Sequence, residues 1–227
     1  MILRFRATPR GMTAAKKPEV DPARIVAADF VAGATRAEQL PPPALAEIAF
    51  AGRSNVGKSS LLNAMMQRRS LVRTSRTPGC TRQINVFGCK TADGFSLHLV
   101  DLPGYGYAKL SKAEKSTWGL MLEGYLRTRI TLRALVVLTD IRRGLEDDDR
   151  ELLEFIRATR GGDAVTPSLP EVVPLVIATK LDKLPMNKRK PALAEYKRVS
   201  GVAPVGFSAV TGEGREELWE RIRRAAT

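Results

Sequence analysis

The sequence predicts an α/β fold: a doubly wound, mostly parallel six-stranded sheet with helices on both faces. Two observations support this prediction. Short apolar runs of strand length alternate with segments of helical periodicity along most of the 227 residues. Polar turn residues follow several of these runs, as expected where the carboxyl ends of parallel strands form a ligand site. A hydrophobic content of 44% is enough for a buried core.

The predicted elements follow one another after a short N-terminal segment. Residues 1–24 contain Pro, Ala, Lys and Arg without periodicity, which predicts a flexible basic extension before one folded domain over 25–227. Apolar runs predict strands at residues 47–51, 83–89, 95–101, 134–139, 173–179 and 203–207. Helical patterns predict helices at residues 58–67, 112–127, 148–157, 187–199 and 214–224.

The N-terminal segment and the cysteines bear on the compartment. The segment lacks the apolar core of a secretory signal, and we expect translation to start at Met12. The apolar runs are far shorter than the roughly 20 residues that span a bilayer, so we expect no membrane span and a cytoplasmic protein. Cys80 and Cys89 lack metal-ligand spacing, and with the single His98 they predict free thiols rather than a zinc or haem site.

Charge favours a polyanionic partner, because the net charge is +13 and the pI is about 10.2. No acidic residue lies between Glu47 and Asp93, where the cations are Arg53, Lys58, Arg68, Arg69, Arg73, Arg76, Arg82 and Lys90. A second basic region contains Lys183, Lys188, Arg189, Lys190, Lys197 and Arg198. A solvated surface with counter-charge for a nucleotide would account for only a few of these cations. The excess favours nucleic acid as a partner.

The first motif fits G-x-x-x-x-G-K-S and lies between a predicted strand and a predicted helix, the context of a phosphate-binding P-loop. Backbone N–H groups of such a loop turn toward phosphate oxygens. Lys58 would supply charge to the β and γ phosphates, and the Ser59 hydroxyl would bind Mg²⁺. The motif predicts a P-loop NTPase whose nucleotide-binding residues are Gly52, Arg53, Ser54, Asn55, Val56, Gly57, Lys58 and Ser59.

A second motif, Asp101, Leu102, Pro103 and Gly104, ends another apolar strand. Asp101 would hold the water shell of the metal beside the P-loop, and Gly104 would offer its N–H to the γ-phosphate. Alone, this sequence is more often an ordinary turn. Its position after the P-loop favours the nucleotide site.

A third motif predicts which base is bound. Thr179, Lys180, Leu181 and Asp182 close a strand. A carboxylate there can accept from guanine N1–H and the 2-amino group, whereas adenine offers neither donor. Lys180 can lie along the base, and the segment Phe207, Ser208 and Ala209 would bring a backbone N–H to guanine O6. These residues predict GTP and GDP as ligands and disfavour a P-loop kinase, for which no acceptor site is evident.

Residues 74–83 are polar and turn-rich, and we expect them to be mobile without ligand. A threonine in this segment can complete the Mg²⁺ shell only when the γ-phosphate is present, which couples hydrolysis to order and disorder of the segment. Thr77 and Thr81 both qualify on spacing.

Together these residues resemble the EngB family, also called YihA or YsxC, of Era-like bacterial GTPases in the TrmE-Era-EngA branch. The resemblance covers about residues 25–225. It rests on the segments GRSNVGKSSLLNA, TSRTPGCTRQIN, DLPGYGYAKLSK with the following Trp118 and Tyr125, TDIRRG, TKLDKL and FSA. Three features depart from the family or vary within it: Leu181 replaces a frequent alanine, residues 161–171 look like an insertion, and the basic extension at residues 1–24 varies.

The resemblance implies more than the residues alone. It selects Thr81 as the metal threonine with Ser59, and it adds nucleotide contacts at Gly79, Cys80, Thr81, Arg82 and Gln83. It implies a switch that acts on the large ribosomal subunit or its precursor, including rRNA, and that is needed for cell division and septation. We expect a monomer. The alternative is a division-site binding protein whose nucleotide is mainly structural.

Hydrolysis is expected to be slow, because Tyr105 stands where a glutamine usually orients water. In the related TrmE and EngA enzymes, an asparagine at the place of Asn55 supplies an oxygen to K⁺. We therefore predict Lys58, Thr81 and Asn55 as catalytic residues and K⁺ as a further candidate ligand. The simpler interpretation of Asn55 is a turn residue.

Overall fold

A computed structural model describes residues 24–72, 83–105, 112–160 and 169–227. Its strands are β1 (Ile25–Ala34), β2 (Glu47–Gly52), β3 (Ile84–Thr91), β4 (Ser96–Asp101), β5 (Leu132–Asp140), β6 (Val173–Thr179) and β7 (Val205–Gly206). Its α-helices are α1 (Lys58–Met65), α2 (Lys112–Thr128), α3 (Asp147–Arg160), α4 (Met186–Ser200) and α5 (Arg215–Ala226). Two short 3₁₀ turns lie at Ala37–Gln39 (η1) and Leu181–Lys183 (η2).

The strands form one sheet in the order β1-β3-β4-β2-β5-β6-β7. The pairs β2–β4, β2–β5, β5–β6 and β6–β7 are parallel, whereas β1–β3 and β3–β4 are antiparallel. The α/β, mostly parallel fold class is confirmed, as are all six predicted strands and all five predicted helices. Within the described residues, no helix is long and apolar enough to cross a membrane.

The sheet has seven strands rather than the predicted six, and the additional strand is β1. β1 is an edge strand with two register shifts against β3, so its apolar and polar residues do not alternate cleanly. Val26, Phe30 and Val31 are exposed on it. The predicted basic extension lies almost wholly outside the described residues, as does most of the 161–171 insertion.

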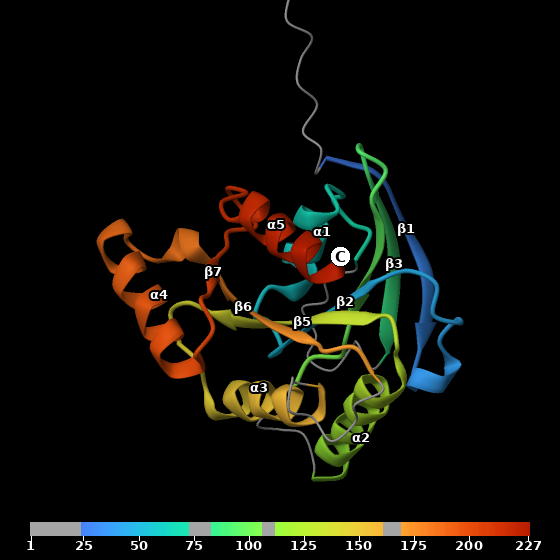
Figure 1. Cartoon of the computed structure of the whole chain (residues 1–227). Coiled ribbons are helices and arrows are strands. Elements are labelled where there is room, and N and C mark those ends of the chain that lie inside the picture. Colours follow the sequence, from blue (N-terminus) through green and yellow to red (C-terminus); the bar gives the residue numbers. More distant parts are fainter. Residues whose placement is uncertain (1–23, 73–82, 106–111, 161–168) are drawn as a thin grey trace, which may run out of the picture.

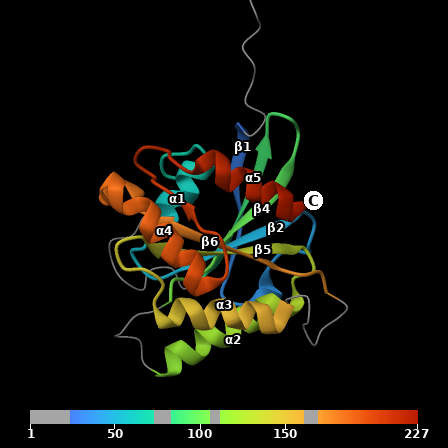
Figure 2. The same cartoon turned by 60° about the vertical axis from the view of Figure 1, so that its left-hand side comes forward.

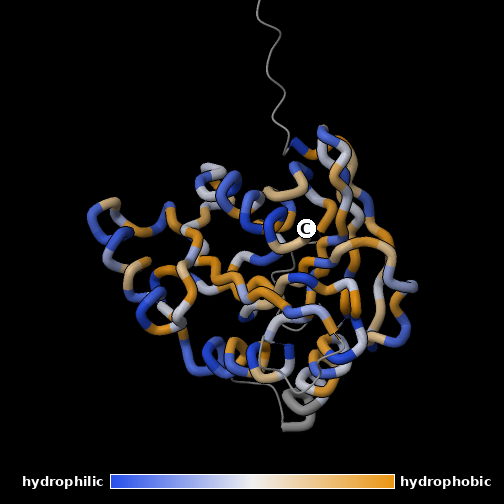
Figure 3. The backbone as a smooth tube through the Cα atoms, viewed as in Figure 1, coloured by the Kyte–Doolittle hydropathy of each residue, from blue (hydrophilic) through white to orange (hydrophobic). Residues whose placement is uncertain are grey.

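Helices cover both faces of the sheet, as predicted (Figures 1 and 2). One core contains apolar residues of α1 and α5, including Leu61 and Trp219. The other contains residues of α2, α3 and α4, including Tyr125, Ile156 and Tyr196. Hydrophobic residues dominate the central strands, and hydrophilic residues dominate the outer turns of the helices (Figure 3).

A buried polar network lies at the end of the sheet where β2 begins. Arg129, after α2, forms an ion pair with Glu47, the first residue of β2. The Tyr125 hydroxyl also donates to Glu47, with an O–O distance of 2.7 Å. Glu47 and Tyr125 are fully buried, and Arg129 is nearly so. Burial is the main cause that raises the pKa of Tyr125, followed by the Glu47 charge. The network ties α2 to the central strand that leads into the P-loop.

Replacing Arg129 by Met should lower the free energy of unfolding by about 3–5 kcal/mol, because the Glu47 carboxylate would stay buried without its cation. Urea unfolding checks this expectation. In the control, Arg127→Met removes a surface pair with Glu123 and should cost less than about 1 kcal/mol. Adding Glu47→Gln to Arg129→Met should recover part of the loss. Equal stability of the two arginine variants would contradict the assigned role of the network.

Candidate functional site

The P-loop turns between the carboxyl end of β2 and the first residue of α1. Asn55 and Gly57 have positive φ angles of 62° and 109°, a region that favours Asn and Gly. A Cβ at Gly52 would lie 2.9 Å from Val56 Cγ1, so only glycine permits this close turn. Lys58 starts α1, and its buried Nζ forms an ion pair with Asp101. The two groups expected to contact phosphate and the metal's water shell therefore lie together.

The Asp101 to Gly104 segment lies directly against the P-loop. Ser54 N donates to Tyr105 O and Tyr105 N donates to Gly52 O, each at 3.3 Å. A Cβ at Gly104 would come within 3.0 Å of Ser54 Oγ, which explains the glycine. On the other side, Trp118 Nε1 of α2 donates to Pro103 O at 3.0 Å. The segment is thus held between the P-loop and α2.

Tyr105 does not point at the phosphate-binding loop. Its side chain is 5% exposed, and its hydroxyl donates to Asp149 Oδ1 of α3 at 2.8 Å. Burial raises its pKa well above the ordinary value, and the Asp149 charge adds to the rise. Burial also raises the pKa of Asp149, although hydrogen bonds from Glu146 N and Tyr105 oppose it. The phenol is therefore engaged by α3 and does not stand in for a water-orienting glutamine.

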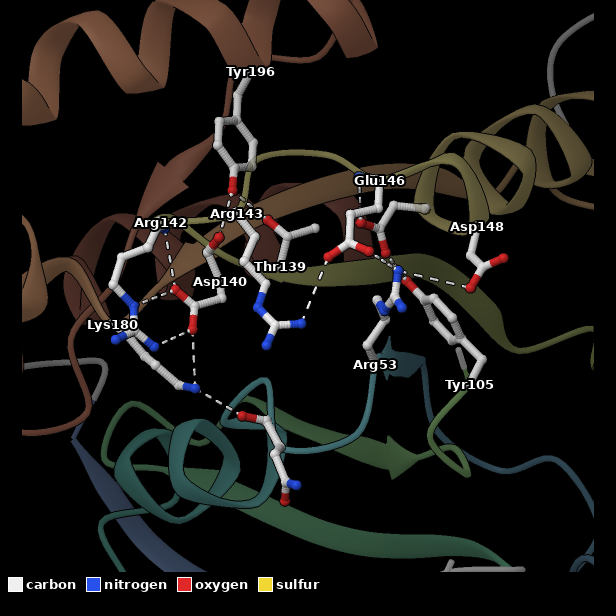
Figure 4. A network of polar contacts seen from close by, with 12 residues as sticks. Arg53, Tyr105, Thr139, Asp140, Arg142, Arg143, Glu146, Asp148, Lys180 and Tyr196 are labelled. Carbon is white, nitrogen blue, oxygen red and sulfur yellow. Dashed lines mark hydrogen bonds and ion pairs between the residues drawn. The ribbon is translucent and has the colours of Figure 1, made fainter. Parts of the chain in front are cut away.

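Acidic residues around the start of α3 also hold the P-loop. Arg53 forms an ion pair with Glu146 and lies 3.8 Å from an Asp148 carboxylate oxygen (Figure 4). Arg143 lies 3.8 Å from the same Glu146. Neither Glu146 nor Asp149 was predicted as a site residue. The acidic run after TDIRRG was the signal that could have directed attention to them.

The third motif is hydrogen-bonded to the P-loop. The Thr179 hydroxyl lies 2.7 Å from Val56 O and 2.8 Å from Thr139 O. Lys180 has a positive φ of 59°, and its Nζ donates to Asn55 O at 2.8 Å. The Lys180 side chain thus extends toward the P-loop, and the plane of a nucleotide base could lie along its aliphatic part.

Asp140 at the end of β5 was not predicted as a site residue. Its carboxylate lies 3.1 Å from Lys180 Nζ and accepts from Arg142 Nε at 2.9 Å (Figure 4). The Arg142 hydrogen bonds are the main cause that holds the Asp140 pKa well below its usual range. Asp140 therefore stays ionised and fixes the Lys180 ammonium. Asp140 belongs to the segment TDIRRG, which contributed to the family resemblance, but the sequence alone did not identify the residues that its carboxylate contacts.

Asp182 and the segment after β7 also meet. The buried Ser208 hydroxyl donates to Asp182 Oδ1 at 2.7 Å, which lowers the pKa of that carboxyl. Leu181 N donates to Phe207 O at 3.1 Å. Leu181 is buried, and its side-chain carbons lie close to Gly206. The leucine that replaces a frequent alanine is therefore part of the core.

The structure thus brings together the P-loop, the Asp101 segment, the third motif and the segment from Phe207 to Ala209. Gln83 is exposed just before β3. The predicted contacts Gly79, Cys80, Thr81 and Arg82, together with the alternative Thr77, lie outside the described residues. Cys89 is a buried free thiol, as predicted, and burial raises its pKa to about 12.

The oxygen donors present fit Mg²⁺. Ser59 follows Lys58 at the start of α1, and its hydroxyl has no hydrogen bond among the described residues. Asp101 adds a carboxylate nearby. No group of three or more His, Cys, Asp or Glu side chains that could hold a metal occurs among the described residues. This donor set is typical of Mg²⁺ held by one or two protein oxygens together with phosphate and water.

Comparison with known proteins settles the family. A family model described as "50S ribosome-binding GTPase" matches residues 47–166. A probable GTP-binding protein EngB from Geobacter metallireducens is 46% identical over 202 residues, which cover 88% of this chain and 92% of the relative. The chain belongs to the EngB family. It is accordingly a GTP-binding protein with the P-loop fold of the Era-like GTPases, and an enzyme that hydrolyses GTP.

Two solved structures share the fold of this EngB-family chain. A probable GTP-binding protein engB has a TM-score of 0.58 at 23% identity, covering 80% of this chain and 98% of the other. Era in complex with MgGDPNP and nucleotides 1506–1542 of 16S ribosomal RNA has a TM-score of 0.61 at 21% identity. That match covers 82% of this chain and 58% of Era.

Replacing Asp182 by Asn should reverse the base preference, because an amide can donate to the 2-oxo group of xanthine but cannot accept both guanine donors. The expected result is a loss of GTP affinity of tenfold or more and a gain of XTP binding, measured by competition against a fluorescent nucleotide. Asp147→Asn, which alters an exposed carboxylate of α3, is the control. If the variant prefers GTP over XTP by the same affinity ratio as the wild type, Asp182 does not recognise the base.

Proposed function

We propose that the protein is a Mg²⁺-dependent GTP switch that acts in assembly of the large ribosomal subunit. The observation that carries the GTP switch is the joining of the P-loop to the Lys180–Asp182 turn by direct hydrogen bonds. The ribosomal role is supported by the family model's description and by the net charge of +13. We place the protein in the cytoplasm as a monomer, and we infer that division and septation depend on it through ribosome supply.

The roles of the site residues follow from their chemistry. Lys58 would leave Asp101 to contact the β and γ phosphates, and Asp101 would then orient water around Mg²⁺. Ser59 would ligate the metal in both nucleotide states. Thr81 would ligate it only beside the γ-phosphate, which makes that segment the switch. Asp182, fixed by Ser208, would select guanine.

Binding to the large subunit is the direct test of the ribosomal role. We expect the protein to co-sediment with purified large subunits in the presence of a non-hydrolysable GTP analogue, and at least tenfold less in GDP. Rising salt should weaken the complex, since phosphate neutralisation releases counterions. Absence of binding in both nucleotides would contradict the proposal and favour the division-site protein with a structural nucleotide.

Asn55 is the proposed source of electrostatic help for hydrolysis, because Tyr105 is engaged by Asp149. The Asn55 side chain is exposed and makes no hydrogen bond with the described residues, so it caps no turn among them. Its backbone oxygen accepts from Lys180, and its positive φ already favours Asn or Gly. A free amide oxygen beside the phosphate site suits K⁺, which would offset charge that develops during phosphoryl transfer.

GTP turnover should be several-fold faster in K⁺ than in Na⁺ at equal ionic strength and fixed Mg²⁺. Asn55→Gly should abolish the difference, because it removes the amide while glycine keeps the positive φ without strain. GDP affinity, measured alongside, should change little. Equal rates in both salts for the wild type, with and without large subunits, would reduce Asn55 to a turn residue.

A further inference from the structure

Helix α4 is attached to the domain along one side, where Ala192, Leu193 and Val199 pack against the core as partly buried residues. Of its residues Met186–Ser200, only Tyr196 and Ser200 are buried. The Tyr196 hydroxyl accepts from Thr139 Oγ1 at 2.8 Å and lies 3.2 Å from Asp140 O, to which it donates. The helix is therefore anchored along one side beside β6 and β7, and the rest of its circumference faces outward (Figures 1 and 2).

The outward side of α4 is a ridge of small or neutral residues. Asn187, Pro191 and Ala194 are all exposed. They are spaced four and three residues apart, so they lie on one line along the helix. None of them carries a charge or a long side chain, and the next residue on this line, the exposed Arg198, is paired with Glu195. Such a ridge allows the helix backbone to approach a partner closely.

Lysines flank this ridge on both sides. At about 100° per residue, Lys190 and Lys197 fall on one side of the ridge and Lys188 falls on the other. All three are exposed, and no ion pair joins any of them to a carboxylate of the described residues. The remaining cations of this region are paired, since Arg189 meets Glu213, Arg198 meets Glu195, and Lys183 meets Asp182. Three uncompensated positive charges therefore border the neutral ridge.

We propose that α4 docks on double-helical RNA, with its ridge facing the minor groove and its three lysines reaching the phosphates on either side. This inference rests on the proposed ribosomal role and assigns the RNA contact to one surface. The minor groove of RNA is wide and shallow, and it is recognised mainly through its shape, its 2′-hydroxyls and its phosphates. A neutral ridge with Lys190 and Lys197 on one side and Lys188 on the other matches that form.

The same observations favour RNA over an acidic protein segment. An acidic helix would need an apolar stripe to bury, but the ridge offers Asn187, Pro191 and Ala194. An apolar hollow of about 480 Å³ does lie on the Lys190 and Lys197 side, lined in part by Leu181, Met186, Leu193 and Pro204. Lys188 faces away from that hollow and would gain nothing from a partner seated in it. Only an extended polyanion uses all three lysines.

The test compares two charge-matched triple variants of the full chain. One is Lys188→Gln, Lys190→Gln, Lys197→Gln on α4. The control is Arg24→Gln, Arg36→Gln, Lys90→Gln, which removes three exposed and unpaired cations at or near the β1–β3 edge, at the opposite end of the sheet. Binding to a fluorescent RNA hairpin is followed by anisotropy over a range of salt concentrations. GDP affinity and melting temperature are measured on both and should match the wild type.

We expect the α4 variant to bind the hairpin at least tenfold more weakly. The slope of log affinity against log salt should fall by about 2–3, because each phosphate contact contributes about 0.7–0.9. The control should keep most of its affinity. Equal losses in the two variants, or an unchanged slope in the α4 variant, would overturn the assignment.

Purified large subunits separate this inference from the proposed function. If the wild type and the α4 variant bind subunits equally well, the ribosomal role stands and the α4 assignment fails. If the α4 variant loses subunit binding but keeps hairpin binding, α4 contacts protein rather than RNA, and the assignment again fails. If the wild type does not bind subunits at all, the ribosomal role itself fails.

Discussion

The candidate site depends on the direct attachment of the segment from Thr179 to Asp182 to the P-loop. The Thr179 hydroxyl contacts Val56 O, and Lys180 Nζ contacts Asn55 O, so the turn after β6 cannot shift without disturbing the loop after β2. Parallel pairing of β2, β5 and β6 makes this possible, because their carboxyl ends reach the same edge of the sheet. A nucleotide has its base and phosphates at a fixed separation. The attachment presets that separation before the ligand arrives, which lowers the ordering cost of binding.

A second set of contacts explains the expected slow turnover. The acidic start of α3 engages Arg53 of the P-loop through Glu146 and Tyr105 through Asp149. These contacts hold both segments in place, and they leave Tyr105 unable to orient the attacking water as a glutamine would. The proposed source of help with the developing charge is a cation at Asn55, or the proposed ribosomal partner. Low intrinsic activity would suit the proposed switch, since the GTP form would then persist until the proposed partner is engaged.

The sequence predicted those parts of the structure in which one short segment carries its own chemistry. Lys58 and Asp182 belong to motifs whose spacing alone predicts phosphate and guanine contacts, and the structure brings the two motifs together. Asp140, Glu146 and Asp149 escaped prediction because the contacts that tie them to the site, with Lys180, Arg53 and Tyr105, join residues 40 or more positions apart. Such pairs become visible only once the sheet aligns the strand ends. β1 escaped for a different reason, since an irregular, half-exposed edge strand has no clean alternation to detect.

The most direct test of the account is a crystal structure of the protein with Mg²⁺ and a non-hydrolysable GTP analogue. The account predicts that one nucleotide spans both attached segments. Lys58 should have moved from Asp101 to the β and γ phosphates, and Asp182 should accept from guanine N1–H and the 2-amino group. Lys180 should keep its contact with Asn55 O. A base bound away from the Lys180–Asp182 turn, or a Lys58 that remains on Asp101 with the γ-phosphate present, would contradict it.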